Sequence, residues 1–357
     1  MASVIELKEH YKTDQRYLET TTDESPSLLE IKNLTISSIG IKGQEEKNIV
    51  NKLNLTIKAG EMLGLVGESG SGKSLTASSI VGLLPNSLKV VDGQILFKGK
   101  DLRTISQKEM RCVRGKGAAY IFQNYQESFT PFIKVGYQLI ETLRSHEKIR
   151  KQEAKDKALF WLELVDLPAK QIFGCYPHQL SGGQLQRAAL AAALMLKPSL
   201  IVADEPTTAL DVLTGERILD LLVDLQKEVD CAILLISHDL KHVLKRTNTV
   251  AVMYGGQIVE KGPTENIRSN PIHPYTKLLL QTRLVLSKAI PSRLDTIPGE
   301  PGLVSQKGCS FSLRCPAAFE RCGATPHLRA VGHFHSTACH SIEMEGDELD
   351  ATSQKCL

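Results

Sequence analysis

The stretch Gly67-Glu68-Ser69-Gly70-Ser71-Gly72-Lys73-Ser74 fits the pattern G-x-x-x-x-G-K-[ST], which is typical of loops that bind phosphate groups. The residues before it, Met62–Val66, read as a short buried strand, and residues 75–84 after it carry apolar side chains at helical spacing. A strand, a glycine-rich loop and a helix in this order are the context that the pattern requires. The sequence therefore predicts an α/β fold with a nucleotide site built on this loop.

The glycine, lysine and final serine residues of this loop each have a physical role in binding a polyphosphate. Glycines let the backbone curl until successive N–H groups point into one concavity, and the following helix adds the partial positive charge of its N-terminus. Lys73 can reach the outer phosphates as a point charge, and the Ser74 hydroxyl is a suitable ligand for Mg²⁺. We therefore expect all eight residues from Gly67 to Ser74 to bind the nucleotide.

The bulk composition is that of a soluble globular protein and excludes several classes of protein. The chain has 357 residues, of which 42% are hydrophobic and 23% charged, so we expect two domains or one domain with an appendage. A net charge of +3 is too small to indicate a nucleic-acid partner. The longest apolar run, residues 188–196, is too short to span a bilayer, and the N-terminus lacks the pattern of a secretion signal. We therefore expect a cytosolic protein whose eight cysteines form no structural disulfides.

The composition and hydrophobic pattern of the chain change along its length, and these changes indicate the predicted domain boundaries. Strand patterns begin at Leu28, a Lys- and Glu-rich helical stretch interrupts them, and beyond about Pro263 the chain becomes irregular and forms a separate C-terminal piece. The predicted divisions are a flexible tail over 1–27, an α/β domain over 28–265 with a helical insertion at about 124–183, a C-terminal region over 266–345 and a flexible tail over 346–357.

Polar residues follow several strongly apolar strand patterns. Strands at 118–122, 200–203 and 232–236 alternate with helical patterns, which predicts a parallel sheet covered on both faces. Ligands of such sheets bind at the carboxyl ends of the strands. The residues that fall there, besides the glycine-rich loop, are Gln123, Asp204, Glu205 and His238.

These polar residues suit the hydrolysis of a bound nucleotide. Asp204 can hold Mg²⁺, Glu205 can orient or deprotonate the attacking water, and His238 can contact the γ-phosphate. Gln123 can bind Mg²⁺ or water and report the state of the nucleotide to the helical insertion. Alone, an Asp-Glu pair is more often a solvated turn and a histidine after a strand more often structural. The phosphate loop in the same chain favours the functional interpretation.

A second loop suited to anions opens another helix. Leu180 is followed by Ser181, Gly182, Gly183 and Gln184 at the start of a helical pattern. One nucleotide does not need two such loops, so we expect these four residues to close on a nucleotide bound to a partner subunit. The alternative is an ordinary glycine turn before a helix.

Together these motifs resemble an ATP-binding cassette (ABC) protein over about residues 28–265. The resemblance identifies Walker A as Gly67–Ser74, the Q-loop as Gln123, the signature as Leu180–Gln184, Walker B as Leu200–Glu205, the D-loop as Ala209–Asp211 and the switch histidine as His238. It implies a P-loop NTPase (RecA-like) ABC cassette of class α/β with a helical subdomain and a small irregular C-terminal extension. It also implies ATP hydrolysis with Mg²⁺ by two cassettes that hold two ATP molecules between them.

One departure from the family pattern concerns the adenine base. The family usually stacks an aromatic side chain on adenine, whereas residues 37–50 contain none. We expect an aliphatic contact instead, from Ile39 or Ile41. The oligopeptide/dipeptide/nickel importer branch often lacks that aromatic residue.

The C-terminal region resembles the same importer branch, through Pro271–Thr276, Ile297–Pro301 and Gly308–Pro316. The resemblance implies a peripheral subunit on the cytoplasmic face of the cell membrane that hydrolyses ATP to drive uptake of oligopeptides or dipeptides. It implies as partners a second, paralogous ATPase subunit, two integral-membrane permeases and an extracytoplasmic substrate-binding protein, and no nucleic acid. Import of nickel or another metal chelate is the alternative, and a soluble ABC ATPase without a transport role is a further one.

Four cysteines crowd into this C-terminal region: Cys309, Cys315, Cys322 and Cys339. As thiolates they would suit Zn²⁺ or an iron–sulfur cluster, although the paired C-x-x-C of zinc ribbons is absent. Resemblance to cluster-carrying members of the branch favours [4Fe-4S]. Four reduced cysteines without metal are the alternative.

Overall fold

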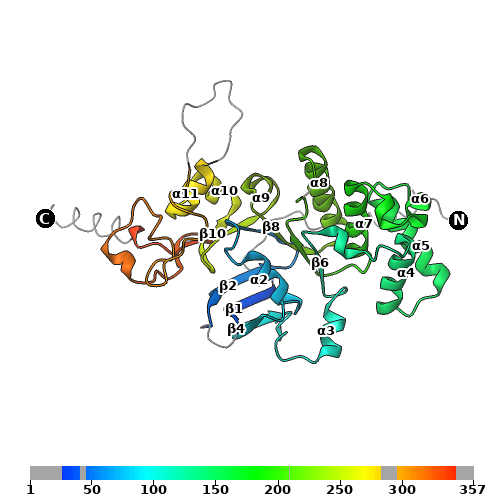
Figure 1. Cartoon of the computed structure of the whole chain (residues 1–357), viewed down its shortest axis with the longest axis horizontal. Helices are drawn as coiled ribbons and strands as arrows, with labels where there is room; N and C mark the ends of the chain where they lie inside the picture. The colour runs from blue at the N-terminus through cyan, green and yellow to red at the C-terminus, as the bar shows by residue number, and fades with distance from the viewer. Residues whose placement is uncertain (1–25, 41–45, 209, 283–295, 343–357) are drawn as a thin grey trace, which may run out of the picture.

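A twisted eight-stranded sheet forms the centre of the protein in the computed structural model, which describes residues 26–40, 46–208, 210–282 and 296–342 (Figure 1). Its strand order is β11-β12-β10-β9-β3-β8-β7-β6, and the five strands from β9 to β6 run parallel. The strands are β3 (Met62–Val66), β6 (Ala118–Ile121), β7 (Leu200–Asp204), β8 (Ala232–Ser237), β9 (Thr249–Tyr254), β10 (Gln257–Pro263), β11 (Arg329–Gly332) and β12 (His335–Thr337). The predicted parallel sheet is therefore confirmed.

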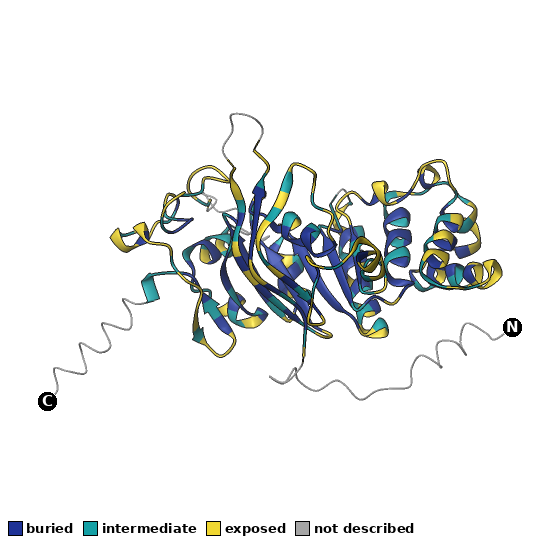
Figure 2. Ribbon diagram, turned by 90° about the horizontal axis from the view of Figure 1, so that it is seen from below, coloured by how far each residue is buried: buried dark blue, intermediate teal, exposed yellow. Residues whose placement is uncertain are grey.

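The parallel strands are buried on both faces. Along β3, Met62 and Val66 pack into one hydrophobic core, whereas Leu63 and Leu65 pack into the other. Because side chains alternate between the two faces of a strand, a strand buried on both faces reads as a continuous apolar run. Figure 2 shows these central strands in the colour of buried residues.

A second, antiparallel sheet covers one face together with helix α2. Its order is β2-β1-β4-β5, and Leu29 and Ile31 of β1 face Ile57 and Leu55 of β2. Its strands are β1 (Ser27–Ser38), β2 (Asn48–Lys58), β4 (Leu88–Phe97) and β5 (Lys100–Asp101), and the helices beside it are α2 (Lys73–Ile80) and α3 (Gln107–Val113). The period-two alternation indicated strands here, but it did not indicate that they form a sheet of their own.

The helical insertion lies at one end of the molecule (Figure 1). It contains η1 (Tyr125–Ser128), α4 (Val135–His146), α5 (Lys151–Leu164), α6 (Ala169–Gly174) and η2 (Pro177–Gln179), followed by α7 (Gly182–Leu194). Helices α8 (Val212–Val229) and α9 (Leu240–Arg246) lie between this end and α10 (Thr264–Ser269). In the described residues no helix has the length and apolar character needed to cross a membrane.

The C-terminal region lies at the opposite end and continues the central sheet (Figure 1). It includes α11 (Pro274–Gln281), η3 (Glu320–Gly323) and the hairpin of β11 and β12. Strand β12 pairs with β10 through Glu260 and Thr337, so the C-terminal region adds strands to the edge of the central sheet. The division limits stay predictions. Residues 1–25 of the tail predicted over 1–27, and the whole tail predicted over 346–357, lie outside the described residues.

A fully buried carboxylate attaches this region to the sheet. Glu260 accepts hydrogen bonds from the backbone N–H groups of Ile272 (2.7 Å) and His273 (3.1 Å), and His335 Nε2 lies 2.8 Å from Glu260 Oε1. A buried charge is tolerated only when such partners replace water. The next helix, α11, begins directly after these contacts, because His273 Nδ1 accepts a hydrogen bond from the Tyr275 N–H and so acts as N-cap.

The cap histidine gives a testable pH dependence. Burial lowers the pKa of His273 to about 3, far below its ordinary value of 6.5. Between these values the unfolded chain binds a proton that the folded chain does not, so stability is fully present above pH 6.5 and falls as the pH drops towards 3. We expect His273→Asn, which can still cap the helix, to flatten this part of the melting-temperature profile between pH 7 and 4. Parallel profiles for the two proteins would contradict the assignment.

Candidate nucleotide-binding site

The glycine-rich loop connects β3 to α2, as the sequence predicts. Gly67 has φ 156° and packs so closely on the Met253 carbonyl that a Cβ would lie 2.1 Å from its oxygen. Gly72 is the N-cap of α2 with φ 102°, a conformation that residues with a Cβ rarely adopt. The two glycines are therefore required by the local backbone, independently of any ligand.

The loop closes around the ammonium group of Lys73. Its Nζ donates hydrogen bonds to the carbonyl oxygens of Gly67 (2.8 Å) and Glu68 (2.9 Å), and the residue is 5% exposed. Burial lowers the pKa of Lys73, and the carboxylates of Glu205, Asp204 and Glu68 act in the opposite direction. A cation held in this way is positioned to exchange loop carbonyls for the oxygens of a phosphate chain.

The polar residues predicted at the strand ends lie at one edge of the sheet. Strands β3, β8, β7 and β6 are neighbours in this order and run parallel, so the residues that follow them are adjacent. The phosphate loop follows β3, His238 follows β8, Asp204 ends β7 and Gln123 comes shortly after β6. Residues spread over 172 positions, from 67 to 238, are therefore brought together.

Asp204 lies beside the loop serine in a largely buried position. The Ser74 hydroxyl donates to Asp204 Oδ1 at 3.0 Å, and the Tyr120 hydroxyl donates to Oδ2 at 2.7 Å. Burial raises the pKa of Asp204, whereas the two hydrogen bonds lower it. Two hard oxygen donors at this spacing suit Mg²⁺. Tyr120 is not among the site residues predicted from the sequence, although a polar aromatic residue within an otherwise apolar strand was a signal for it.

Glu205 lies at the centre of a hydrogen-bonded group. Its Oε1 is 3.1 Å from His238 Nδ1, and its Oε2 accepts from Gln123 Nε2 and from the Thr208 hydroxyl, both at 3.0 Å. The Glu205 backbone is in the left-handed region, with φ 46°, so the side chain leaves the strand end in a defined direction. Thr208 was also missed; the signal was a hydroxyl three residues after a carboxylate.

The second glycine loop begins α7 in the helical part of the molecule. Ser181 is its N-cap and forms a capping box with Gln184, with hydrogen bonds of 3.3 and 3.0 Å. A Cβ on Gly182 would lie 2.6 Å from the Tyr125 hydroxyl, which explains the glycine there. Ser181 is exposed at the start of the helix. Of the D-loop, Ala209 lies outside the described residues.

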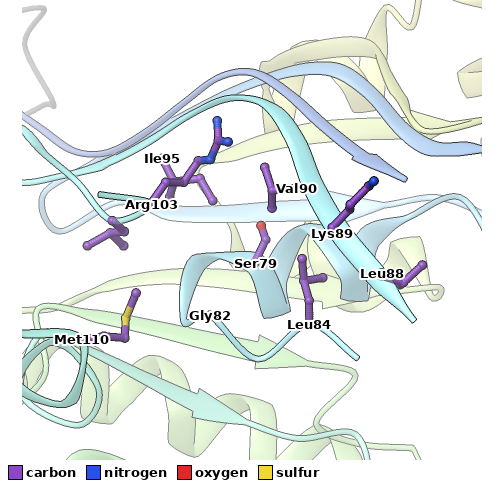
Figure 3. A pocket seen from close by; sticks show the side chains of 10 residues that line it. Ser79, Gly82, Leu84, Leu88, Lys89, Val90, Ile95, Arg103 and Met110 are labelled. Carbon is purple, nitrogen blue, oxygen red and sulfur yellow. The ribbon is translucent and has the colours of Figure 1, made fainter. Parts of the chain in front are cut away.

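The adenine contact stays a prediction. Ile39 is 43% exposed, which is compatible with an apolar contact to a base, while Ile41 lies outside the described residues. A cavity of about 270 Å³ lies between the C-terminal part of α2 and β4, and residues such as Ser79, Val90 and Met110 line it (Figure 3). None of the predicted site residues lines this cavity, so it is separate from the nucleotide site.

The four cysteines of the C-terminal region lie close to one another. Burial raises the pKa of Cys309 to about 11, and negative charge on Cys322, Cys339 and Cys315 would raise it further. Within the four described ranges, however, no group of three or more His, Cys, Asp or Glu side chains is arranged to hold a metal ion. As they stand, the thiols therefore do not form a metal-ligand set.

Two family matches cover most of the described chain. Residues 50–208 match the ABC transporter family, and residues 259–322 match the oligopeptide/dipeptide transporter C-terminal region. The sequence is 45% identical to the oligopeptide transport ATP-binding protein OppD of Bacillus subtilis over 82% of each chain. It is 39% identical to OppD of Salmonella typhimurium over 90% of this chain and 97% of that protein.

Solved cassettes share the fold. The ATP-binding cassette MJ0796, in a dimeric post-hydrolysis state bound to ADP and Pi, matches with a TM-score of 0.59 and 28% identity over 66% of this chain and 98% of that chain. CbiO1 from Clostridium perfringens, part of the complex cbiONQ, matches with a TM-score of 0.59 and 26% identity, over 69% and 92% of the two chains. The shared part is the cassette, which explains why about a third of this chain is not covered.

Proposed function

The chain belongs to the ATP-binding proteins of ABC transporters, and we propose that it is the ATP-hydrolysing subunit of an importer of oligopeptides or dipeptides. The observation that carries the proposal is the assembly of Lys73, Ser74, Asp204, Glu205 and His238 at one edge of the sheet, in a chain that also has the C-terminal region of oligopeptide transporters. The relatives named above are oligopeptide transport ATP-binding proteins.

In this proposal the residues at the sheet edge divide the work of hydrolysis. The backbone of the loop and Lys73 bind the phosphates of ATP. Glu205 is the general base that takes a proton from the attacking water, and His238 and Gln123 orient Glu205 and that water. The hydrogen bond from Thr208 fixes the Glu205 carboxylate, so we add Thr208 as a positioning residue.

Mg²⁺ is the metal that this arrangement suits. Ser74 and Asp204 would hold it, together with Gln123, because oxygen donors are the ligands that this ion prefers. When bound, the ion neutralises charge that develops on the phosphate oxygens. Tyr120 keeps one carboxylate oxygen of Asp204 occupied and so leaves the other directed at Ser74.

An exposed apolar surface at the start of the helical insertion supports docking of the permeases. Phe132 is 87% exposed, Tyr137 50% and Ile133 40%, and all three lie at the start of the helical insertion. Large apolar side chains grouped at a surface are typical of interaction sites. Attachment to two integral-membrane permeases, with a substrate-binding protein outside, would place the chain at the cytoplasmic face of the membrane.

A second apolar surface supports pairing with another cassette. Val212 and Leu213, directly after the D-loop, are 75% and 72% exposed. In the proposed pair, Ser181, Gly182 and Gly183 contact ATP held by the partner's phosphate loop. We propose a paralogue as that partner, on the resemblance to the importer branch.

A sulfur-ligated metal centre at the four cysteines is a finer proposal. Its support is that the thiols of Cys309, Cys315, Cys322 and Cys339 are close enough to perturb one another, while their present arrangement is not that of a ligand set. Iron, zinc and acid-labile sulfide in protein purified without oxygen test it, and metal contents near zero would contradict it.

The transport function is tested by uptake in a deletion strain. We expect loss of labelled oligopeptide uptake, restored by the wild-type gene and not by a Glu205→Gln version. Unchanged peptide uptake together with lost nickel uptake would instead support the metal-chelate importer. If the protein purifies from cells without any multi-span permease bound to it, that result would contradict a transport role.

A further inference from the structure

The phosphate loop carries a negative charge in an unfavourable position. Glu68 is the second residue of the loop, and its carboxylate would repel the phosphates of an approaching nucleotide. In the structure this carboxylate forms a two-point pair with Arg314, in which Nη1 lies 2.6 Å from Oε2 and Nη2 lies 3.0 Å from Oε1. The two residues are 246 positions apart in the sequence.

The backbone of the same loop residue is also held from the C-terminal region. The Glu68 N–H donates a hydrogen bond to the Tyr275 hydroxyl at 2.9 Å. Tyr275 is fully buried and packs against Tyr254 and Phe311, with ring centroids 4.7 and 5.3 Å away. A phenol enclosed in this way cannot swing to another partner, so the backbone position of Glu68 depends on it.

Arg314 is held in place independently of the loop. Its Nε donates to the Pro298 carbonyl at 2.7 Å, Nη1 lies 3.4 Å from the Tyr254 hydroxyl, and its side chain is 1% exposed. Removing one partner of such a pair leaves the other without compensation, whereas an exposed pair contributes little. The guanidinium is therefore a fixed positive charge that the C-terminal region places at the loop.

Three separate motifs of the C-terminal region take part in these contacts: two of them reach Glu68, and the third holds Arg314. Pro271–Thr276 supplies the Tyr275 hydroxyl, Ile297–Pro301 supplies the Pro298 carbonyl and Gly308–Pro316 supplies Arg314. Gly299 belongs to the same arrangement, since it has φ +74° and a Cβ there would lie 3.2 Å from Arg314 Cγ. Cassette function alone does not require these three segments to meet here.

We propose that Arg314 and Tyr275 are positioning residues for ATP: Arg314 cancels the charge of Glu68 and Tyr275 fixes the loop backbone. The proposal rests on the proposed function only in taking ATP as the ligand of the loop. The C-terminal region thus contributes to the nucleotide site of its own chain. Arg314 and Tyr275 act through Glu68.

A series of charge-neutralising variants separates this role from a merely structural tether. Arg314→Gln leaves an uncompensated carboxylate beside the phosphates. Because the negative charge of Glu68 then repels the phosphates of ATP, we expect about a tenfold weaker Kd for ATP. Glu68→Gln leaves Arg314 unpaired and should tighten ATP binding by about threefold. The double variant should return to within about threefold of wild type. A tether predicts that the double variant is as weak as, or weaker than, Arg314→Gln.

The measurements use the full chain and a fluorescent ATP analogue without turnover, followed by steady-state kinetics. We expect KM to follow Kd across the series, with a smaller change in kcat. Arg314→Lys keeps the charge but loses the two-point geometry, so it should weaken ATP binding less than Arg314→Gln does. The tighter binding expected of Glu68→Gln keeps the test decisive if Arg314→Gln does not fold. Tyr275→Phe removes one hydrogen bond and should weaken binding by about three- to tenfold.

The outcomes distinguish this proposal from the proposed function. A wild-type chain that binds no ATP would contradict the function itself. ATP binding that is normal in the wild type and unaffected by Arg314→Gln, or no recovery in the double variant, would overturn the positioning role alone.

Discussion

Replacing Glu205 by glutamine is expected to leave ATP binding intact and to reduce ATP turnover at least about a hundredfold, the scale on which general bases act. Glutamine keeps the size of the side chain but cannot accept a proton from water. The pair with His238 Nδ1 at 3.1 Å becomes an ordinary hydrogen bond, and the contacts to Gln123 and Thr208 can persist. Phosphate release under saturating ATP measures the loss.

The same variant should accumulate as a stable ATP-bound dimer. Removing a carboxylate from beside the phosphates also reduces repulsion, so the closed state lasts longer. Light scattering with and without ATP detects it, and Ser181→Arg in the same chain should prevent it by blocking closure on the partner's nucleotide. Glu163→Gln on the exposed face of α5 is the matched control. Hydrolysis at the normal rate by Glu205→Gln would show that the base is another group.

Lys73→Ala is expected to have the second large effect, on binding rather than on turnover. The lysine contributes charge-assisted contacts, each of order 1.5–3 kcal/mol, so a total loss of about 2–4 kcal/mol in ATP affinity follows. This corresponds to roughly thirty- to a thousandfold in Kd. Removing Nζ also frees the carbonyl oxygens of Gly67 and Glu68, which adds disorder to the loop.

Isothermal titration with ATP and Mg²⁺ measures this loss. Lys108→Ala on α3, an exposed lysine outside the site, is the control for a change of charge alone. Thermal melts of both variants separate a binding defect from unfolding. A Kd for Lys73→Ala within twofold of wild type would place the phosphates elsewhere.

Much of the site could be predicted because its residues lie in short sequence patterns that can be recognised locally. The loop from Gly67 to Ser74 has its pattern in eight consecutive positions, and Asp204, Glu205 and His238 each follow a short apolar strand. Parallel strands always bring their carboxyl ends to one edge, so finding the strands was enough to bring the residues together. Tyr120 and Thr208 were missed because their roles depend on which oxygen they reach, and spacing does not show that.

The C-terminal region was the least predictable part of the fold. Its irregular, Pro-rich sequence gave no periodic signal, so β12 and its pairing with β10 were not expected. A three-residue strand is stabilised by its neighbours and not by its own propensity. The same applies to the antiparallel sheet, where alternation identified strands but not their partners.

The sequence by itself determined the phosphate loop, the positions of the parallel strands along the chain and the chemistry at their ends, since each depends on residues close together in the chain. Only the tertiary structure decided that Arg314 and Tyr275 reach Glu68, and that Glu260 joins the C-terminal region to the sheet. The physical reason is that the pattern of neighbouring residues indicates only the local conformation of the backbone. Pairing of two groups 246 positions apart depends on how whole elements pack, which no local pattern contains.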